Sequence, residues 1–387
     1  MPVLLPNIDP KAVLRWTAGV TSVCLFCSAA AAQMPTEGGF NHAPDLWLVN
    51  PGQPWHHSVQ GAAQPAELRR REPEPAERAV VANAKMMFAN SSAKAMALVK
   101  GRDVIWMDVK PPVTPESLIN GFSMGKTVTA MAVGKAICAG RLTLRTQAME
   151  PVQELQDKDL GRATVADLLT MRSGAWEGNP DSTIWTAQEV QALAAGQISW
   201  LELLASPRVS AAATGFFGTR RKPGETFSYH STDPLLLGVM LARSTGKSYA
   251  QWTAQEVLLP ARIEGPAAIA QDKAAGYGNA DGGVRMKLAD WVRYAVWQRE
   301  SEAAEGCFGQ FVRDAVRGHT PSHRTGSVPS SYGYLNWVQG DINWAIGYGG
   351  QRIGWNRRND RILVAFSSVE NYMTELHELY GAWAALP

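Results

Sequence analysis

A serine and a lysine three residues apart, Ser123 and Lys126, could form a nucleophile and its proton acceptor. On a helix this spacing puts both side chains on one face, one turn apart, within reach of proton transfer. In a water-poor cleft, burial would lower the pKa of the lysine, so that the neutral amine could take the serine proton. The positive field of the helix amino terminus would favour the alkoxide. The pair therefore predicts a serine that attacks a carbonyl and becomes acylated.

The Ser-x-x-Lys spacing occurs three times, so its surroundings must identify the functional copy. Ser244 to Lys247 lies where Gly246 would end a helix, and Ser91 to Lys94 precedes a predicted strand. Only Ser123 opens a segment in which apolar residues recur at helical spacing, from Val128 to Ile137. The sequence therefore favours Ser123.

Gly121 to Gly125 also satisfies the GxSxG nucleophile elbow, which requires a buried strand running directly into the first glycine. Prolines interrupt the preceding residues 110–120. Only His377, in the last predicted helix, follows late enough to act as the base. The elbow is therefore the less favoured interpretation.

Three successive motifs resemble the signatures of the class C β-lactamase-like family of serine hydrolases. They are Phe122-Ser-Met-Gly-Lys126, Leu168-Leu-Thr-Met-Arg-Ser-Gly174 and Lys222-Pro-Gly-Glu-Thr-Phe-Ser-Tyr-His-Ser231, and the resemblance covers roughly residues 90 to 386. The later run Leu235-Leu-Leu-Gly238 is similar to that of the esterases and of the 6-aminohexanoate-dimer hydrolase type. The resemblance implies a β-lactamase/transpeptidase-like fold.

By this resemblance, Tyr229-His-Ser231 is the second family motif. A phenol beside the Lys126 ammonium loses its proton more readily and can pass a proton to the leaving group. β-Lactamases usually have asparagine where this chain has Ser231, which favours an esterase or amidase. His230 is expected to turn away from the serine or to act only through its neighbours.

Two segments could supply the third family motif, Arg324-Thr-Gly-Ser327 and Gly347-Tyr-Gly-Gly-Gln351. The second is favoured because predicted strands follow it at once, as in the strand-turn-strand ending of the family. Its glycines, among them Gly350, would let the backbone approach a substrate. The resemblance assigns the second oxyanion-hole amide, beside that of Ser123, to Gln351. Tyr348 would then lie at the substrate site.

Two tryptophans, Trp176 and Trp185, follow the Met-Arg-Ser-Gly turn and could line the substrate site. The segment from Gly282 to Trp291 resembles the part of the family that closes the cleft before a helix. Gly-Gly pairs are usually only turns, so this segment carries less weight.

Strands near both ends of the chain, with helices between them, predict an α+β fold. The expected antiparallel sheet is built from N- and C-terminal segments and flanked by helices. The predicted strand segments are 95–109, which forms a hairpin, 332–338, 350–355 and 361–367, and a closing helix covers 372–385. The expected organisation is a signal peptide (1–32), an N-terminal extended arm (33–90), a sheet domain (91–150 and 285–387) and a mostly helical insert (151–284).

The amino terminus has the pattern of a cleavable secretory signal. Lys11 and Arg15 precede a short apolar stretch over residues 18–32 that ends in small residues. The stretch is short for a spanning helix, which needs about 20 residues. We therefore expect export to a bacterial periplasm or secretion, with cleavage near Ala32 and no stable membrane anchor afterwards.

Composition excludes some classes of partner. The chain has 387 residues, of which 19% are charged, and a formal net charge of +2, too small for a nucleic-acid or membrane-surface protein. The predicted chemistry requires no metal or organic cofactor. The cysteines that remain after the leader, Cys138 and Cys307, are expected to be two buried free thiols rather than a pair. The oligomeric state is left open.

The sequence thus predicts a serine hydrolase acting on a small-molecule ester or amide. A β-lactamase or D-alanyl-D-alanine peptidase of the same fold is the alternative within enzymes. A non-catalytic binding protein on this fold is the alternative of another class, and the presence of Ser123, Lys126 and Tyr229 argues against it.

Overall fold

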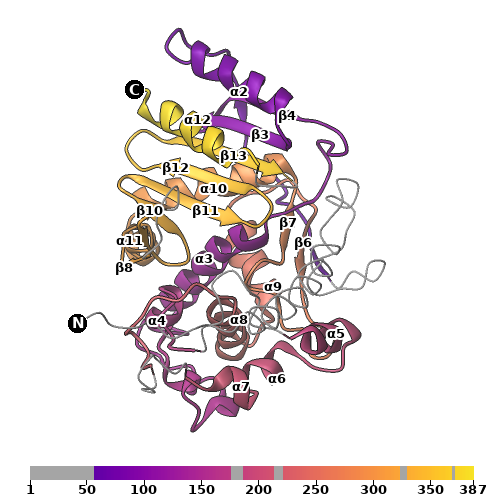
Figure 1. The fold of residues 1–387 in the computed structure, drawn as a ribbon, viewed down its shortest axis with the longest axis vertical. Helices are drawn as coiled ribbons and strands as arrows, with labels where there is room; N and C mark the ends of the chain where they lie inside the picture. Colours follow the sequence, from indigo (N-terminus) through magenta and orange to yellow (C-terminus); the bar gives the residue numbers. More distant parts are fainter. Residues whose placement is uncertain (1–55, 176–185, 213–220, 323–328, 368–370) are drawn as a thin grey trace, which may run out of the picture.

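The fold is described from a computed structural model, which covers residues 56–175, 186–212, 221–322, 329–367 and 371–387 (Figure 1). Its main sheet has nine strands and joins the two ends of the chain. In order across the sheet these strands are β2 (Arg69–Arg70), β4 (Asp103–Val109), β3 (Ala93–Lys100), β13 (Arg361–Ser367), β12 (Gln351–Asn356), β11 (Ile342–Gly347), β10 (Trp337–Gln339), β9 (Ser331–Tyr332) and β8 (Thr320–Pro321).

The last strand, β13, pairs antiparallel with β3, which confirms the predicted sheet sewn from distant segments. Every residue of β13 is buried, as are all residues of β3 except its last. Both strands consist largely of continuous apolar residues, which is the pattern expected for strands covered on both faces. The predicted hairpin of residues 95–109 is also confirmed, as β3 paired with β4.

Eleven helices are described. They are α2 (Arg78–Asn90), α3 (Gly125–Cys138), α4 (Val165–Leu169), α5 (Ala187–Ala195), α6 (Trp200–Leu204), α7 (Pro207–Ser210), α8 (Thr232–Thr245), α9 (Tyr249–Thr253), α10 (Leu288–Ala303), α11 (Gly306–Ala315) and α12 (Met373–Ala385), with the short helical turns η3 (Phe122–Met124), η4 (Gln153–Leu155), η5 (Leu160–Arg162) and η6 (Ala254–Leu258). Capping boxes fix the beginnings of α4, α5, α6 and α9.

Helices cover both faces of the sheet. Arg361 of β13 stacks on Trp383 of α12, whereas Phe366 of the same strand packs against Trp291 of α10. Side chains alternate along a strand, so these two contacts lie on opposite faces. The helices α3 to α9 lie beyond one end of the sheet (Figure 1). The helix α3 is buried along nearly its whole length and contacts α8, α9 and α11, so it ties the two regions together.

Of the predicted extended arm (33–90), residues 33–55 lie outside the described residues, and the last part is not extended but forms the helix α2. Val81, Ala84 and Phe88 of α2 are buried, and this helical spacing was hidden within a polar, charged stretch. A second, four-stranded sheet was not predicted at all. Its order is β1 (His56–Val59), β6 (Ala267–Ala270), β7 (Val284–Met286) and β5 (Ile119–Asn120). Strands this short are held by tertiary pairing rather than by local pattern.

The predicted strand 332–338 is also corrected. It is two short strands, β9 and β10, which pair antiparallel across a tight turn. Gly333 lies in that turn, where a Cβ would fall 2.3 Å from the carbonyl oxygen of Ala315. The side-chain amide of Asn336 donates hydrogen bonds to the carbonyl oxygens of Tyr334 and Ala315, which fixes the reversal.

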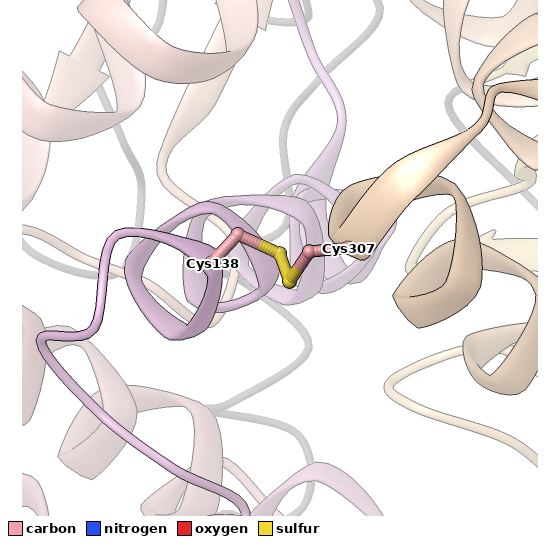
Figure 2. Close-up of a disulfide and its surroundings, with 2 residues drawn as sticks. All are labelled: Cys138 and Cys307. Atoms are coloured by element: carbon pink, nitrogen blue, oxygen red, sulfur yellow. A yellow bond between two sulfur atoms is a disulfide. The ribbon is translucent and has the colours of Figure 1, made fainter.

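The prediction of two free thiols was wrong. Cys138, at the end of α3, and Cys307, in α11, form a disulfide with a Cα–Cα distance of 5.7 Å (Figure 2). The two cysteines are 169 positions apart. They meet because α11 packs against α3, with Phe311 against Gly134, where a Cβ would fall 2.3 Å from the Phe311 ring. The disulfide thus links the end of α3, the helix that follows Ser123, covalently to α11.

Replacing both cysteines with serine is expected to lower the free energy of unfolding by about 2–4 kcal/mol, because the cross-link restricts a long loop of the unfolded chain. Urea titration of oxidised wild type and of the Cys138→Ser/Cys307→Ser variant would measure this difference. Reduced wild type should behave like the variant. Equal urea midpoints for all three samples would contradict the expected contribution.

Candidate active site

The turn that carries Ser123 is fixed by tight packing. The buried strand β5 leads into Gly121, followed by η3, which contains Ser123, and then by α3. A Cβ at Gly121 would fall 2.5 Å from the Trp291 ring, so glycine is needed there for space. Phe122 has a φ of +47°, which is uncommon for a non-glycine residue and marks a constrained turn.

The nucleophile-elbow alternative is not supported. A strand does enter Gly121, but β5 is two residues long and pairs with β7 of the small sheet. His377 packs against Trp344, with ring centroids 4.7 Å apart, and burial lowers its pKa to about 4. The partner of Ser123 Oγ is instead Lys126.

Ser123, Lys126 and Tyr229, the three residues predicted to be catalytic, lie close together. Lys126 Nζ donates a hydrogen bond to Ser123 Oγ at 2.7 Å. The same nitrogen lies 4.9 Å from the centroid of the Tyr229 ring. Lys126 is 2% exposed, whereas Ser123 and Tyr229 are half-buried. A hydroxyl and a phenol that solvent can reach thus meet a buried amine.

An acidic residue that sequence reasoning missed, Asp281, completes this group. Its carboxylate forms an ion pair with Lys126 Nζ, and its main-chain oxygen lies 3.4 Å from the same atom. Ser231 Oγ donates a hydrogen bond to Asp281 Oδ2 at 2.9 Å. Ser231, predicted to face the substrate, is therefore engaged by a protein carboxylate.

The predicted fall in the pKa of Lys126 is not found. Burial does lower this pKa, but the negative charge of Asp281 and the Tyr229 phenol raise it by more. The net pKa of Lys126 lies above its ordinary value of 10.5, so the resting side chain is an ammonium ion. The predicted and observed directions differ because the sequence motifs did not reveal that the Asp281 carboxylate lies beside Lys126.

Asp281 reaches the lysine because Gly282 follows it. A Cβ at Gly282 would fall 2.9 Å from the carbonyl carbon of Phe122, so only glycine lets this loop approach the nucleophile turn. A sequence signal lies next to it, in the segment from Gly282 to Trp291, which resembles the part of the family that closes the cleft before a helix. The functional side chain stands one residue before it.

His230 is buried beside this group and is neutral. Burial lowers its pKa to about 4, the charge of Asp281 opposes this effect, and that of Lys126 adds to it. His230 Nε2 lies 3.7 Å from Asp233 Oδ1. The histidine therefore lies close enough to Asp281 and Lys126 to feel their charges, and its Nε2 is near Asp233.

The turn between β11 and β12, residues 347–351, lies beside the nucleophile. A Cβ at Gly347 would fall 2.2 Å from the Gly121 carbonyl oxygen, which shows how close the two backbones come. The Tyr348 ring packs edge-on against Phe122, with centroids 6.0 Å apart. Tyr348, one of the residues predicted for the substrate site, is thus next to the turn that holds Ser123, and Gly350 lies two positions further along the turn between β11 and β12.

Gln351 braces this turn with its side chain. Its Nε2 donates to the Tyr348 carbonyl oxygen at 2.6 Å, and its Oε1 accepts from the Ser367 amide at 3.0 Å. Gly350, with a φ of +99°, adopts a conformation that favours glycine. The side chain of Gln351 is used inside the protein, so any contact with substrate at this position would come from its backbone.

Two aromatic side chains that the sequence analysis did not single out, Trp337 and Tyr332, pack beside Tyr229. Its ring lies 5.1 Å from Trp337 and 6.0 Å from Tyr332, measured between centroids. Trp176 and Trp185, predicted to line the substrate site, lie outside the described residues. The competing third motif, Arg324 to Ser327, also lies outside them.

Within the described ranges, no group of three or more His, Cys, Asp or Glu side chains could hold a metal ion. Over the same ranges, none of the helices combines the length and the apolar character needed to cross a membrane.

Many solved structures share the fold of this chain. A protein from Bacillus anthracis assigned as a 6-aminohexanoate-dimer hydrolase superposes with a TM-score of 0.65 at 16% identity, covering 89% of this chain and 91% of that one. A penicillin-binding protein from Bacillus halodurans gives 0.60 at 15% identity, covering 78% and 99%. EstCE1, a hydrolase with promiscuous acyltransferase activity, gives 0.60 at 13% identity, covering 80% and 98%. At these identities the likeness shows the fold alone.

Among curated protein sequences, none matches this chain. The family model described as Beta-lactamase matches residues 51–385, which is most of the sequence. That span contains both sheets, the nucleophile turn and the loop that carries Asp281. The chain therefore belongs to the Beta-lactamase family and has its β-lactamase/transpeptidase-like α+β fold.

Proposed function

We propose that the protein is a serine hydrolase that cleaves an ester or amide bond through an acyl-enzyme on Ser123. The observation that carries this proposal is the hydrogen bond of 2.7 Å that the buried Lys126 donates through Nζ to Ser123 Oγ, beside the Tyr229 ring. A non-catalytic binding protein would have no need to hold these three side chains in contact. The family membership and the hydrolase neighbours also support the proposal.

The reaction begins when Lys126 is in its neutral form. Ser123 Oγ attacks the carbonyl carbon and gives its proton to the Lys126 amine. Tyr229 donates a proton to the leaving alcohol or amine and regains one from Lys126. Backbone amides of Ser123 and Gln351 stabilise the oxyanion. Water then attacks the acyl-enzyme, and the hydroxyl of Ser123 is restored.

An ester or an open-chain amide fits the site better than a β-lactam. In β-lactamases an asparagine at the position of Ser231 holds the substrate amide, but here Ser231 donates to Asp281. A β-lactamase or D-alanyl-D-alanine peptidase remains the second candidate because a penicillin-binding protein shares the fold. Penicillin would acylate Ser123 in that case, and intact mass would show the adduct.

We also propose that the protein is exported and works in a periplasm or outside the cell. The amino-terminal signal pattern and the disulfide between Cys138 and Cys307 support this, since disulfides persist in oxidising compartments. The substrate is a small molecule, and no stable membrane anchor is expected after cleavage of the signal.

Labelling with a fluorophosphonate probe tests the proposed nucleophile. We expect intact mass to show one adduct and peptide mapping to place it on Ser123, with complete loss in Ser123→Ala. Ser244→Ala is the matched control, because Ser244 also begins a Ser-x-x-Lys motif but lies at the end of α8. It should label like wild type. Labelling that persists in Ser123→Ala, or that maps to another residue, would refute the assignment.

A further inference from the structure

The carboxylate of Asp281 lies between two residues of the site. It pairs with the Lys126 ammonium through Oδ1 and accepts from the Ser231 hydroxyl through Oδ2 at 2.9 Å. Lys126 in turn donates to Ser123 Oγ. A chain of polar contacts therefore runs from the nucleophile through the lysine and the aspartate to Ser231.

Backbone contacts of Asp281 and of the next residue, Gly282, fix the position of Asp281. Asn279 Oδ1 accepts hydrogen bonds from the amides of Asp281 and Gly282, each at 3.2 Å. Gly282 packs so closely on Phe122 that a Cβ would fall 2.9 Å from its carbonyl carbon. The Asn279 hydrogen bonds therefore fix the shape of the loop, and the packing of Gly282 on Phe122 fixes its distance from the nucleophile turn.

Three ionisable groups from different elements interact with Asp281. They are Lys126 on α3, His230 before α8 and Tyr249 on α9, whereas Tyr229 acts on Lys126. His230 is neutral, and burial together with the charge of Asp281 raises the pKa of Tyr249 to about 12. The Tyr249 hydroxyl is held by Thr129 Oγ1 at 2.7 Å. Of these groups, Lys126 is the one that supplies positive charge to balance the carboxylate at neutral pH.

We infer that Asp281 is a positioning residue that holds Lys126 in place as an ammonium ion and so sets the pH at which the enzyme becomes active. This inference rests on the proposed function, in which Lys126 must be neutral to accept the serine proton. The ammonium must first release a proton to solvent, and the carboxylate opposes that release. Activity should therefore rise with pH into the alkaline range.

The Asp281→Asn variant tests this role, since asparagine keeps the shape and a hydrogen-bond acceptor for Ser231 while removing the charge. We expect the rising limb of kcat/KM against pH, and of the fluorophosphonate labelling rate, to move to lower pH by about one unit or more. Asp341→Asn is the matched control, because it removes a carboxylate from a surface pair with Arg358. Its limb should coincide with that of wild type.

Thermal unfolding gives a second measurement that does not depend on activity. In Asp281→Asn the buried Lys126 loses its counter-charge, so its pKa in the folded state falls below the unfolded value of about 10.5. The folded state then binds fewer protons than the unfolded state, and stability rises with pH. The deficit in Tm relative to wild type should be largest near pH 6 and should shrink towards pH 10. Asp281→Asn/Lys126→Met should recover part of the lost Tm.

The outcomes are separable. A rising limb that coincides with that of wild type, together with a Tm deficit that does not change with pH, would overturn the role of Asp281. If wild type itself is not labelled at Ser123, the proposed function fails, while the Tm comparison still decides whether Asp281 sets the charge of Lys126.

Discussion

Lys126→Ala is expected to lower kcat/KM for hydrolysis of a p-nitrophenyl ester by roughly 10³- to 10⁴-fold, near the top of the range for loss of a general base. Ser123 Oγ would lose its hydrogen-bond partner at 2.7 Å as well as its proton acceptor. The carboxylate of Asp281 would also be left without its cation. Steady-state kinetics, with folding checked by thermal unfolding, would measure the loss.

Lys126→Arg separates the role of base from that of a fixed charge. A guanidinium keeps the positive charge opposite Asp281 but cannot give up a proton near neutral pH. The arginine variant should therefore be as inactive as the alanine variant. Lys247→Ala, in the Ser-x-x-Lys motif at the end of α8, should retain wild-type activity. Activity of Lys126→Arg within about tenfold of wild type would contradict a base role for Lys126.

Glu77→Gln is expected to lower the free energy of unfolding by about 3–5 kcal/mol, because it leaves buried guanidinium charge without its partner. Glu77 is completely buried and accepts from Arg71 at 2.7 Å and from Arg361 at 2.9 Å. Arg361 is also buried, on the sheet strand β13. Chemical denaturation at pH 7 would measure the change. Glu74→Gln is the matched control, since Glu74 pairs with the same Arg71 but is 60% exposed, and it should change stability by less than about 0.5 kcal/mol.

The contribution of Glu77 should also depend on pH. Burial raises the pKa of this carboxyl, but hydrogen bonds from Arg71, the Glu74 amide and Arg361 lower it by more, to about 2. A folded-state pKa below the unfolded value of about 4.5 means that the stabilisation is present above pH 4.5 and is lost as the pH falls towards 2. The difference in free energy of unfolding between wild type and Glu77→Gln should therefore shrink as the pH falls from about 4.5 to about 2. A stability difference that stays constant from pH 6 to pH 2.5 would show that Glu77 is not held ionised.

The sequence was sufficient for the parts of the site that lie in local motifs. Ser123 and Lys126 are one turn apart, so their contact follows from the spacing. Tyr229 could be placed beside them only through the resemblance to a family, because no local pattern links it to α3. The central strands were also predictable, since β3 and β13 are long apolar runs.

The parts that were missed depend on tertiary proximity. Asp281 lies 155 positions from Lys126, and its effect reversed the predicted direction of the lysine pKa. Cys138 and Cys307 meet only because α11 packs on α3, so spacing could not pair them. The four-stranded sheet is built from strands of two to four residues whose pairing partners are distant in sequence. In each case the missing information was which segments become neighbours.

The pairing of β3 with β13 has a consequence for the timing of activity during synthesis. The nucleophile and its lysine are made early, but Tyr229, Asp281 and the turn before β12 come later, and β13 closes the sheet near the end of the chain. A partly synthesised chain therefore contains Ser123 and Lys126 without Tyr229, Asp281 and the turn before β12. Until the last strand is made, β3 also lacks β13, its partner in the main sheet, so the complete set of site residues is assembled only at the end of synthesis.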